Sequence, residues 1–167
     1  GVSSATAIAN GIGSIGEAHG GAAEALAKIL QENKDKSAEE IVKEFQEKKK
    51  RIPGFGHKIY QVDPRTQMLI KIADITGFNG KFVKLALEIE KELEKSSGKK
   101  LPLNIDGIIA ALMSELGFDY SLGKSLFIIS RVVGIASHVH EEQTTAKAVR
   151  RISEEDVTYS GEKQRGL

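Results

Sequence analysis

The sequence contains no cysteine and no tryptophan, and only 5% of its 167 residues are aromatic. Without cysteine the chain can form neither a disulfide framework nor a thiolate metal site. This composition is typical of proteins from a reducing compartment, and we expect a cytoplasmic protein whose functional site contains no metal.

The chain also lacks an excess of either charge, because 24 basic residues nearly cancel 23 acidic ones. A balanced charge gives no overall field that would favour nucleic acid or a membrane surface. There is no unbroken apolar run of about 18 residues and no signal peptide pattern, so we expect no membrane-spanning helix. The basic cluster Lys48–Arg51 lacks the interleaved aromatics of a nucleic-acid-binding module.

The residues that are present favour an all-α fold, because apolar positions recur at helical spacing along most of the chain. Ser37 and Glu40 form a capping-box pattern, and Asp63-Pro64 predicts the start of another helix that ends at Gly77. The first ten residues resemble the middle of a helix that is already packed, so we expect the chain to be a fragment. Its length fits one domain or part of a larger one.

Two of the four histidines lie in glycine-bracketed loops: His19 before Gly20-Gly21, and His57 after Gly54-Phe55-Gly56. Each histidine could cap a helix or fill a turn, but glycine on both sides also suits a backbone that approaches a ligand. The N–H groups after His19 lie at an expected helix start, which suits an anionic or enolate oxygen. The nearby G-x-G-x-x-G match at residues 11–16 follows a helical stretch and is interpreted as accidental.

Asp106 and Arg131 interrupt apolar stretches. Asp106 is either an N-terminal helix cap, which the sequence alone favours, or a base with a shifted pKa. Arg131 needs a carboxylate partner, which is either an internal acid such as Glu141 or the carboxylate of a substrate. Read alone, Arg65 and the Arg150-Arg151 pair look like surface charges.

Five segments together resemble the citrate synthase family in order and nearly in spacing. They are Gly16-Glu17-Ala18-His19-Gly20-Gly21-Ala22, Pro53-Gly54-Phe55-Gly56-His57-Lys58-Ile59-Tyr60, Asp63-Pro64-Arg65, Leu103-Asn104-Ile105-Asp106 and Arg131-Val132-Val133-Gly134-Ile135-Ala136-Ser137-His138. The resemblance covers nearly the whole chain but only the C-terminal portion of a family member. It implies a two-domain helical fold, with large-domain pieces at residues 1–20 and 118–167 around a small domain at 21–117.

The resemblance also implies three catalytic roles. His19 would stabilise the enolate of acetyl-CoA through the thioester oxygen, and Asp106 would be the base that removes the methyl proton. His57 would polarise the ketone of oxaloacetate and give a proton to the new hydroxyl. A base together with a donor at the developing oxyanion is what deprotonation of a thioester methyl group requires.

By the same resemblance, Arg65 and Arg131 would bind the oxaloacetate or citrate carboxylates. Arg150, or Arg151 if the alignment slips by one, would act across the interface of a homodimer. Coenzyme A would enter as the substrate thioester, and the segments suited to its phosphates and adenine are Arg51, Gly54, Phe55 and Gly56.

Within the family, the continuation Asp106-Gly107 resembles citryl-CoA lyase and the C-terminal module of ATP-citrate lyase. We therefore prefer cleavage of citryl-CoA to acetyl-CoA and oxaloacetate, in which His57 would take the hydroxyl proton. The alternatives are a citrate or 2-methylcitrate synthase and a non-catalytic CoA-binding module. The family's further upstream histidine is absent, so we expect a missing N-terminal segment. A citryl-CoA synthetase is the expected partner that would supply citryl-CoA.

Overall fold

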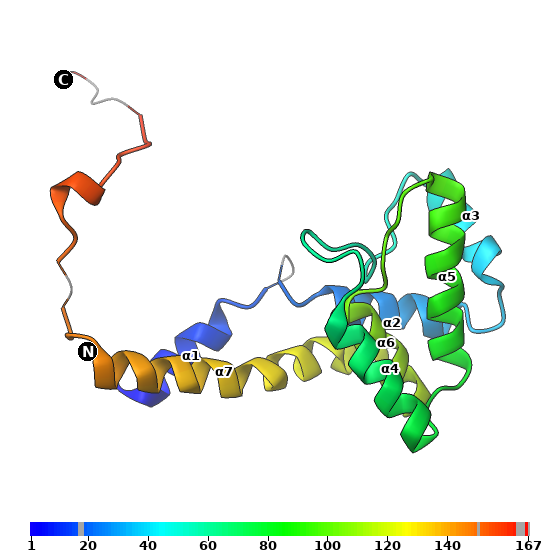
Figure 1. Cartoon of the computed structure of the whole chain (residues 1–167), viewed down its shortest axis with the longest axis horizontal. Helices are drawn as coiled ribbons and strands as arrows, with labels where there is room; N and C mark the ends of the chain where they lie inside the picture. The colour runs from blue at the N-terminus through cyan, green and yellow to red at the C-terminus, as the bar shows by residue number, and fades with distance from the viewer. Residues whose placement is uncertain (17–18, 150, 163–165, 167) are drawn as a thin grey trace.

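The computed structural model describes residues 1–16, 19–149, 151–162 and 166, and within them it contains helices but no strand (Figure 1). The α-helices of this part are α1 (Ser4–Gly13), α2 (Ala22–Glu32), α3 (Ala38–Glu47), α4 (Pro64–Thr76), α5 (Lys81–Ser97), α6 (Ile105–Glu115) and α7 (Gly123–Thr145). Short 3-10 turns occur at Tyr120–Leu122 and Glu154–Asp156. The all-α prediction is confirmed.

Helices α2 to α6 form a compact cluster around one apolar core (Figure 1). Helix α6 is central, because it packs against α2, α4 and α5. The core side chains that are almost completely buried include Leu26, Leu30, Ile41, Val42, Val83, Ile89, Ile108 and Met113. The cluster lies within the predicted small domain, whose boundaries at 21 and 117 stay a prediction.

Local sequence signals explain where the helices of the cluster begin and end. Ser37 and Glu40 form the complete capping box at the start of α3. The Asp63 side chain caps α4, whose first residue is Pro64. Gly77 ends α4 in a left-handed conformation with φ of 77°, which a residue with a Cβ adopts only with strain. These caps confirm the sequence predictions.

Helices α1 and α7 lie side by side and extend away from the cluster (Figure 1). The Ser4 hydroxyl donates to Gln143 Oε1 at 3.0 Å, which joins the start of α1 to the end of α7. The prediction for the first ten residues is wrong in detail, because α1 begins at Ser4 with Ser3 as its N-cap and has no buried residue. The small residues of this segment are compatible with the middle of a helix. The Ser3 hydroxyl, however, accepts a hydrogen bond from Thr6 N and so caps the helix at its start.

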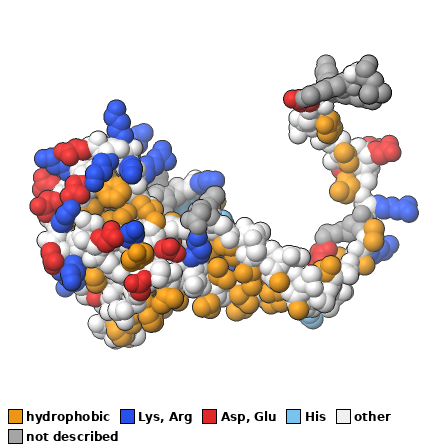
Figure 2. Space-filling model, turned by 180° about the vertical axis from the view of Figure 1, so that it is seen from behind, with side chains coloured by type: hydrophobic (Ala, Val, Ile, Leu, Met, Phe, Trp, Pro, Cys, Tyr) orange, Lys and Arg blue, Asp and Glu red, His pale blue; other side chains and the backbone are white. Residues whose placement is uncertain are grey.

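Much of the apolar surface of α7 is exposed, including Ile129 at 64% and Val133 at 73%. Figure 2 shows apolar side chains gathered along this arm, whereas charged side chains of both signs gather over the helical cluster. The stretch Tyr120–Thr145 is long and apolar enough to cross a membrane, with a mean hydropathy of 1.3 over an 18-residue window. A single helix of this kind is weak evidence for a membrane, because core helices of soluble proteins meet the same criterion.

Candidate active site

A cavity of about 290 Å³ lies where α6 and α7 approach the loops that carry the two histidines. Its lining contains five of the residues predicted from sequence: His19, His57, Arg65, Asp106 and Arg131. These residues come from positions up to 112 apart in the chain (131 minus 19), and the fold brings them to one place. Arg150, the sixth predicted residue of this set, lies outside the described residues.

The side chain of Asp106 does not cap α6. Asn104 is the N-cap, and its Oδ1 accepts hydrogen bonds from the backbone N–H groups of Asp106 at 3.0 Å and Gly107 at 3.1 Å. The Asp106 carboxylate is therefore left free to face the cavity. Its Oδ1 atom is buried and has no hydrogen-bond partner within the described part of the chain.

Burial raises the pKa of the Asp106 carboxyl above its usual range. The positive charges of Arg131, Arg65 and His19 act in the opposite direction but do not cancel the desolvation. A carboxylate with a raised pKa and an unpaired oxygen is a stronger base than an exposed one. Of the two roles that the sequence left open, the geometry favours the base.

The backbone fixes the tautomer of His57. Its Nδ1 atom accepts hydrogen bonds from the N–H groups of Ile59 and Tyr60, both at 3.0 Å. In the neutral ring the proton is consequently on Nε2, which is the nitrogen near Arg65. The separation of 3.4 Å between Nε2 and the Arg65 Nη2 atom is a contact, because both atoms then carry hydrogen.

Asp63 positions Arg65 and was not singled out as a site residue from sequence. Its carboxylate is 1% exposed and accepts from Arg65 N at 3.0 Å, Nε at 3.0 Å and Nη2 at 2.8 Å. It also accepts from Ile105 N at 3.1 Å, at the start of α6. The hydrogen bonds from Arg65 hold the pKa of Asp63 below its usual range.

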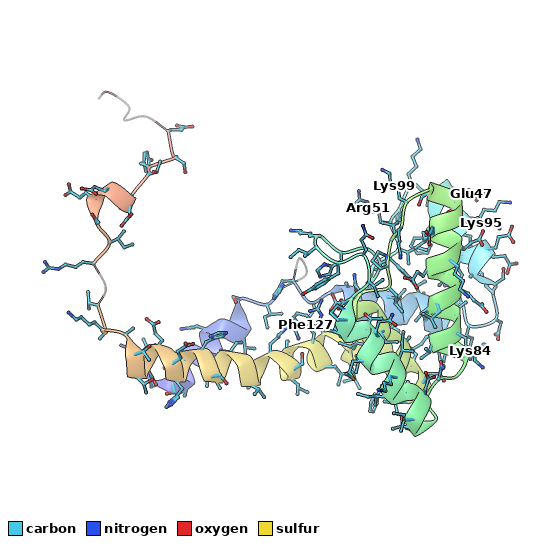
Figure 3. The ribbon with its side chains drawn as sticks, viewed as in Figure 1. Glu47, Arg51, Lys84, Lys95, Lys99 and Phe127 are labelled. Atoms are coloured by element: carbon cyan, nitrogen blue, oxygen red, sulfur yellow. The ribbon has the colours of Figure 1, made fainter. Side chains whose placement is uncertain are left out.

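Phe127 is a second residue that sequence reasoning missed. Its buried ring contacts the His19 ring edge-on, with centroids 5.3 Å apart, and the Arg131 guanidinium lies 4.0 Å from the Phe127 ring centroid. Gly20 passes so close that a Cβ there would lie 2.5 Å from the Phe127 ring. Figure 3 shows Phe127 at the junction of α7 with the helical cluster. Phe127 lies four residues before Arg131, and this helical spacing was the sequence feature that could have indicated their contact.

The internal ion pair suggested for Arg131 is absent from the described residues. Glu141 lies on the same helix ten positions away, about 15 Å along the axis at 1.5 Å per residue, and pairs with His138 at 3.4 Å instead. Arg131 Nη1 donates to Ser130 Oγ at 2.7 Å. Its remaining donors are available to a substrate carboxylate, as the resemblance implied.

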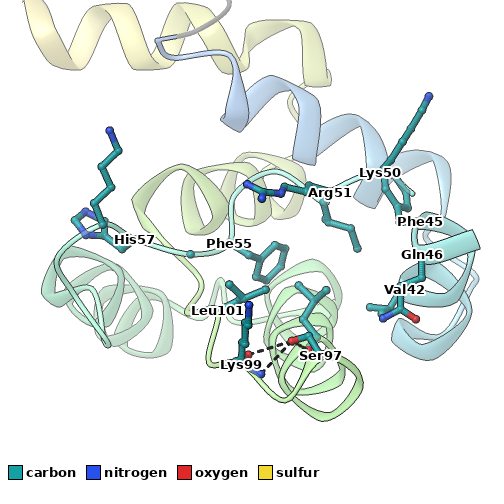
Figure 4. Close-up of a pocket in the computed structure, with 14 residues that line it drawn as sticks. Val42, Phe45, Gln46, Lys50, Arg51, Phe55, His57, Ser97, Lys99 and Leu101 are labelled. Carbon is teal, nitrogen blue, oxygen red and sulfur yellow. Dashed lines mark hydrogen bonds between the residues drawn. The ribbon is translucent and has the colours of Figure 1, made fainter. Parts of the chain in front are cut away.

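A larger cavity of about 630 Å³ adjoins the first one and shares His57 with it (Figure 4). Its lining combines apolar side chains with four cations, which are Lys50, Arg51, Lys58 and Lys99. Phe55 and Gly56 also line this cavity, as predicted for a CoA site. Gly54 is buried and packs against Leu26 and Gly107, so its position does not support the predicted contact with CoA.

Within the described residues no group of three or more histidine, aspartate or glutamate side chains is arranged to hold a metal ion. The smaller cavity is lined by groups that have acid–base and anion-binding chemistry of their own. They are one unpaired carboxylate, two imidazoles and two guanidinium groups. Such a set can remove a proton next to a carbonyl, stabilise the resulting oxyanion and bind a carboxylate substrate.

Comparison with known proteins agrees with this geometry. Residues 1–152 match the family described as citrate synthase, C-terminal domain, and the chain belongs to the citrate synthase family. The solved structure of citryl-CoA lyase from Hydrogenobacter thermophilus is 47% identical with a TM-score of 0.91, and the match covers 100% of this chain and 67% of that one. ATP citrate lyase from Methanothrix soehngenii, in complex with citrate and coenzyme A, is 27% identical with a TM-score of 0.78, covering 97% and 29%.

Among curated proteins, citrate synthase 2 of Bacillus subtilis is 34% identical over 141 residues. That match covers 81% of this chain but only 37% of the relative. The chain thus spans little more than a third of the length of this relative, and only 28% of a probable ATP-citrate synthase from Dictyostelium discoideum.

We predict that Asp106→Asn stabilises the folded chain at neutral pH. Because burial raises the folded pKa, the destabilisation is absent below the unfolded value of about 3.9, grows as the pH rises through the folded pKa and is complete above it. The variant should therefore melt about 2–4 °C higher at pH 7, with a gain that shrinks towards pH 3, as measured by calorimetry. Exposed Asp156→Asn is the matched control. An equal gain at both pH values contradicts the prediction.

Asp63→Asn should have the opposite effect. The amide can still cap α4, but its NH₂ group would face the N–H donors of Arg65 and Ile105, at a cost of about 2–3 kcal/mol. Because the folded pKa of Asp63 is lowered, its stabilisation is present above about pH 4 and is lost as the pH falls through the folded pKa. Urea denaturation measures the loss. Asp119→Asn, at an exposed cap, should be nearly neutral, and equal effects of the two variants would refute this assignment.

Proposed function

We propose that this chain carries the cleavage chemistry of a citryl-CoA lyase, which converts citryl-CoA to acetyl-CoA and oxaloacetate. The observation that carries the proposal is the convergence of His19, His57, Asp106 and two arginines on one cavity. The 47% identity to a citryl-CoA lyase across the full chain supports this activity over others in the family.

In this mechanism the two arginines bind the carboxylates of the citryl group, and their placement orients the bond to be broken. Arg65 is held in place by the buried Asp63, and Arg131 is held against the Phe127 ring. Cleavage moves the bonding electrons to the acetyl part as a thioester enolate. His19 stabilises its oxygen, and Asp106 in its acid form protonates its carbon.

His57 acts at the oxygen that becomes the ketone of oxaloacetate. With Nδ1 accepting two backbone hydrogen bonds, the Nε2–H group donates to the hydroxyl oxygen of the bound substrate before the hydroxyl proton leaves. To take the hydroxyl proton itself, as predicted from sequence, the ring must first move its own proton to Nδ1. The segment Ile59–Tyr60 then has to release its two hydrogen bonds, so proton transfer is coupled to movement of this loop.

The same groups in the opposite protonation states would condense acetyl-CoA with oxaloacetate, so a citrate or 2-methylcitrate synthase is the alternative activity. The 32% identical citrate synthase structure from Thermotoga maritima keeps this alternative open, with a TM-score of 0.63. A non-catalytic CoA-binding module is the second alternative.

The deciding assay follows acetyl-CoA release from citryl-CoA beside citrate formation from acetyl-CoA and oxaloacetate. We expect cleavage to dominate, and Asp106→Asn to lower its kcat by about 10²–10⁴-fold, because the variant has no acid or base at this position. Asp156→Asn should leave both rates unchanged. Dominant citrate synthesis would identify a synthase, and CoA binding without either reaction would identify the binding module.

We further propose that the larger cavity binds the nucleotide part of coenzyme A. Its apolar lining suits the adenine ring, and its four cations suit the phosphates. Arg51 and Lys99 extend on the same side of the cluster, whereas Lys84 lies near the opposite end of α5 (Figure 3). His57 lines both cavities, which supports a CoA site beside the proposed reaction centre.

We expect Arg51→Ala and Lys99→Ala each to weaken CoA binding about three- to tenfold, because each removes a cation near the phosphates. The matched control Lys84→Ala should have no effect. Calorimetric titration at low and high salt measures the affinities, and salt should reduce the difference. Equal affinity in all three variants would place CoA elsewhere.

We also propose that the functional protein is a cytoplasmic homodimer, in which Arg150 reaches the neighbouring site. The exposed apolar side chains of α7 support an assembly, because patches of this kind commonly mark protein interfaces. A citryl-CoA synthetase is the proposed partner that supplies the CoA thioester. Sedimentation of the purified chain and fractionation of its source cells test the dimer and the location.

A further inference from the structure

The loop that carries His57 is fastened to the segment that leads into α6. Gly56 N donates to Pro102 O at 2.7 Å, and Asn104 N donates to Gly54 O at 3.0 Å. The Asn104 amide adds a bond to Gly56 O at 3.0 Å, and Phe55 forms an isolated antiparallel bridge with Leu103. His57 follows one side of this pairing, and Asp106 follows the other.

Gly107 lies at the closest point of this contact. A Cβ at position 107 would lie 2.4 Å from the carbonyl oxygen of Gly54 and 2.5 Å from Leu103 Cδ1. The leucine carbon can rotate away, but the carbonyl oxygen can retreat only if the backbone of the loop moves. Gly54 itself has φ of 85°, and a Cβ there would lie 2.9 Å from Gly107 Cα. Two glycines therefore face each other without side chains between them.

The loop, and not the helix, would yield to a larger residue at position 107. Helix α6 is anchored in the core, where Ile108, Ala110 and Ala111 have no exposed surface. The loop is packed less firmly: Ile52 and Gly54 are buried, but Gly56 and His57 are partly exposed and residues 58–60 are exposed. A side chain at 107 would consequently displace the loop, together with His57, away from Asp106.

We propose that Gly107 is a positioning residue that sets the separation between His57 and Asp106. This inference rests on the proposed function, since the bond to be broken lies between the groups that these two residues serve. It also gives a physical reason for glycine after the catalytic aspartate: the absence of a Cβ lets the two halves of the cavity approach.

The test compares two reactions in Gly107→Ala. Carbon–carbon cleavage needs His57 and Asp106 together, whereas exchange of the acetyl-CoA methyl protons with D₂O needs only His19 and Asp106. In the exchange, Asp106 removes a proton, the enolate forms and solvent deuterium returns through the same carboxyl. Exchange is followed by NMR with malate present, because malate fills the arginine sites and offers no ketone to attack.

We expect kcat for cleavage to fall about 10–100-fold and the exchange rate to change less than about threefold, because misplacement by about 1 Å is costly for the step that needs both groups. Equal losses in both reactions would overturn the proposal, because they would indicate general damage to α6. Unchanged cleavage would overturn it as well.

Two further variants separate the possible causes. Leu103→Val removes the δ-carbon at 2.5 Å, so the double variant Leu103→Val/Gly107→Ala keeps only the backbone conflict. The cleavage defect should persist there, and its rescue would contradict a displaced loop. Gly134→Ala is the matched control, because a Cβ there meets nothing within 4 Å inside α7.

A readout independent of activity distinguishes failure of this inference from failure of the proposed function. In ¹H–¹⁵N NMR spectra, Gly107→Ala should shift the amide signals of residues 54–60, whereas Gly134→Ala should not. Unshifted loop signals in a folded variant overturn the inference, whatever reaction the protein performs. Shifted signals in a protein without cleavage activity would uphold the loop displacement and refute the lyase.

Discussion

The buried carboxylate of Asp63 joins the first turns of α4 and α6 and holds the Arg65 side chain with the same two oxygens. Helix α4 begins just after the His57 loop, and α6 carries Asp106 in its first turn. The relative positions of His57, Arg65 and Asp106 in the cavity therefore depend on the buried carboxylate of Asp63. Its hydrogen bonds are charge-assisted, which makes them shorter and stronger than neutral ones.

Asp63 and Asp106 show how environment divides one residue type into two functions. Both carboxylates lie at the start of α6 and near Arg65, but the oxygens of Asp63 are all hydrogen-bonded, whereas Asp106 keeps one buried oxygen without a partner. The pKa of the first is lowered and that of the second is raised. A satisfied carboxylate stabilises the fold, and an unsatisfied one retains the basicity that proton transfer needs.

Most of the fold followed from sequence because helix caps are local. Ser37 with Glu40, Asp63 with Pro64 and Gly77 each act within one turn, so their patterns alone predicted the helix ends. Read without the family resemblance, the sequence favoured Asp106 as a cap, and this was wrong. Asn104 and Asp106 are both suitable caps, and only coordinates show which one bonds the backbone.

The site residues were predicted from family motifs, whereas their supports were not. The role of Asp63 towards α6, the contact of Gly107 with Gly54 and the ring of Phe127 all depend on tertiary contacts between segments far apart in the chain. The Arg131–Glu141 pair, one of the two alternatives for Arg131, was wrong because both residues lie on α7 ten positions apart, too far to touch.

The ring of Phe127 contacts two segments that are far apart in the chain: the loop of His19 and Gly20, and the turn of α7 that carries Arg131. Phe127 touches the edge of His19, lies under the guanidinium of Arg131 and fills the space where Gly20 has no side chain. Substitutions at these four positions are coupled. A smaller side chain at position 127 would loosen both His19 and Arg131, and a larger residue at position 20 has no room. In related sequences we therefore expect these four positions to vary together.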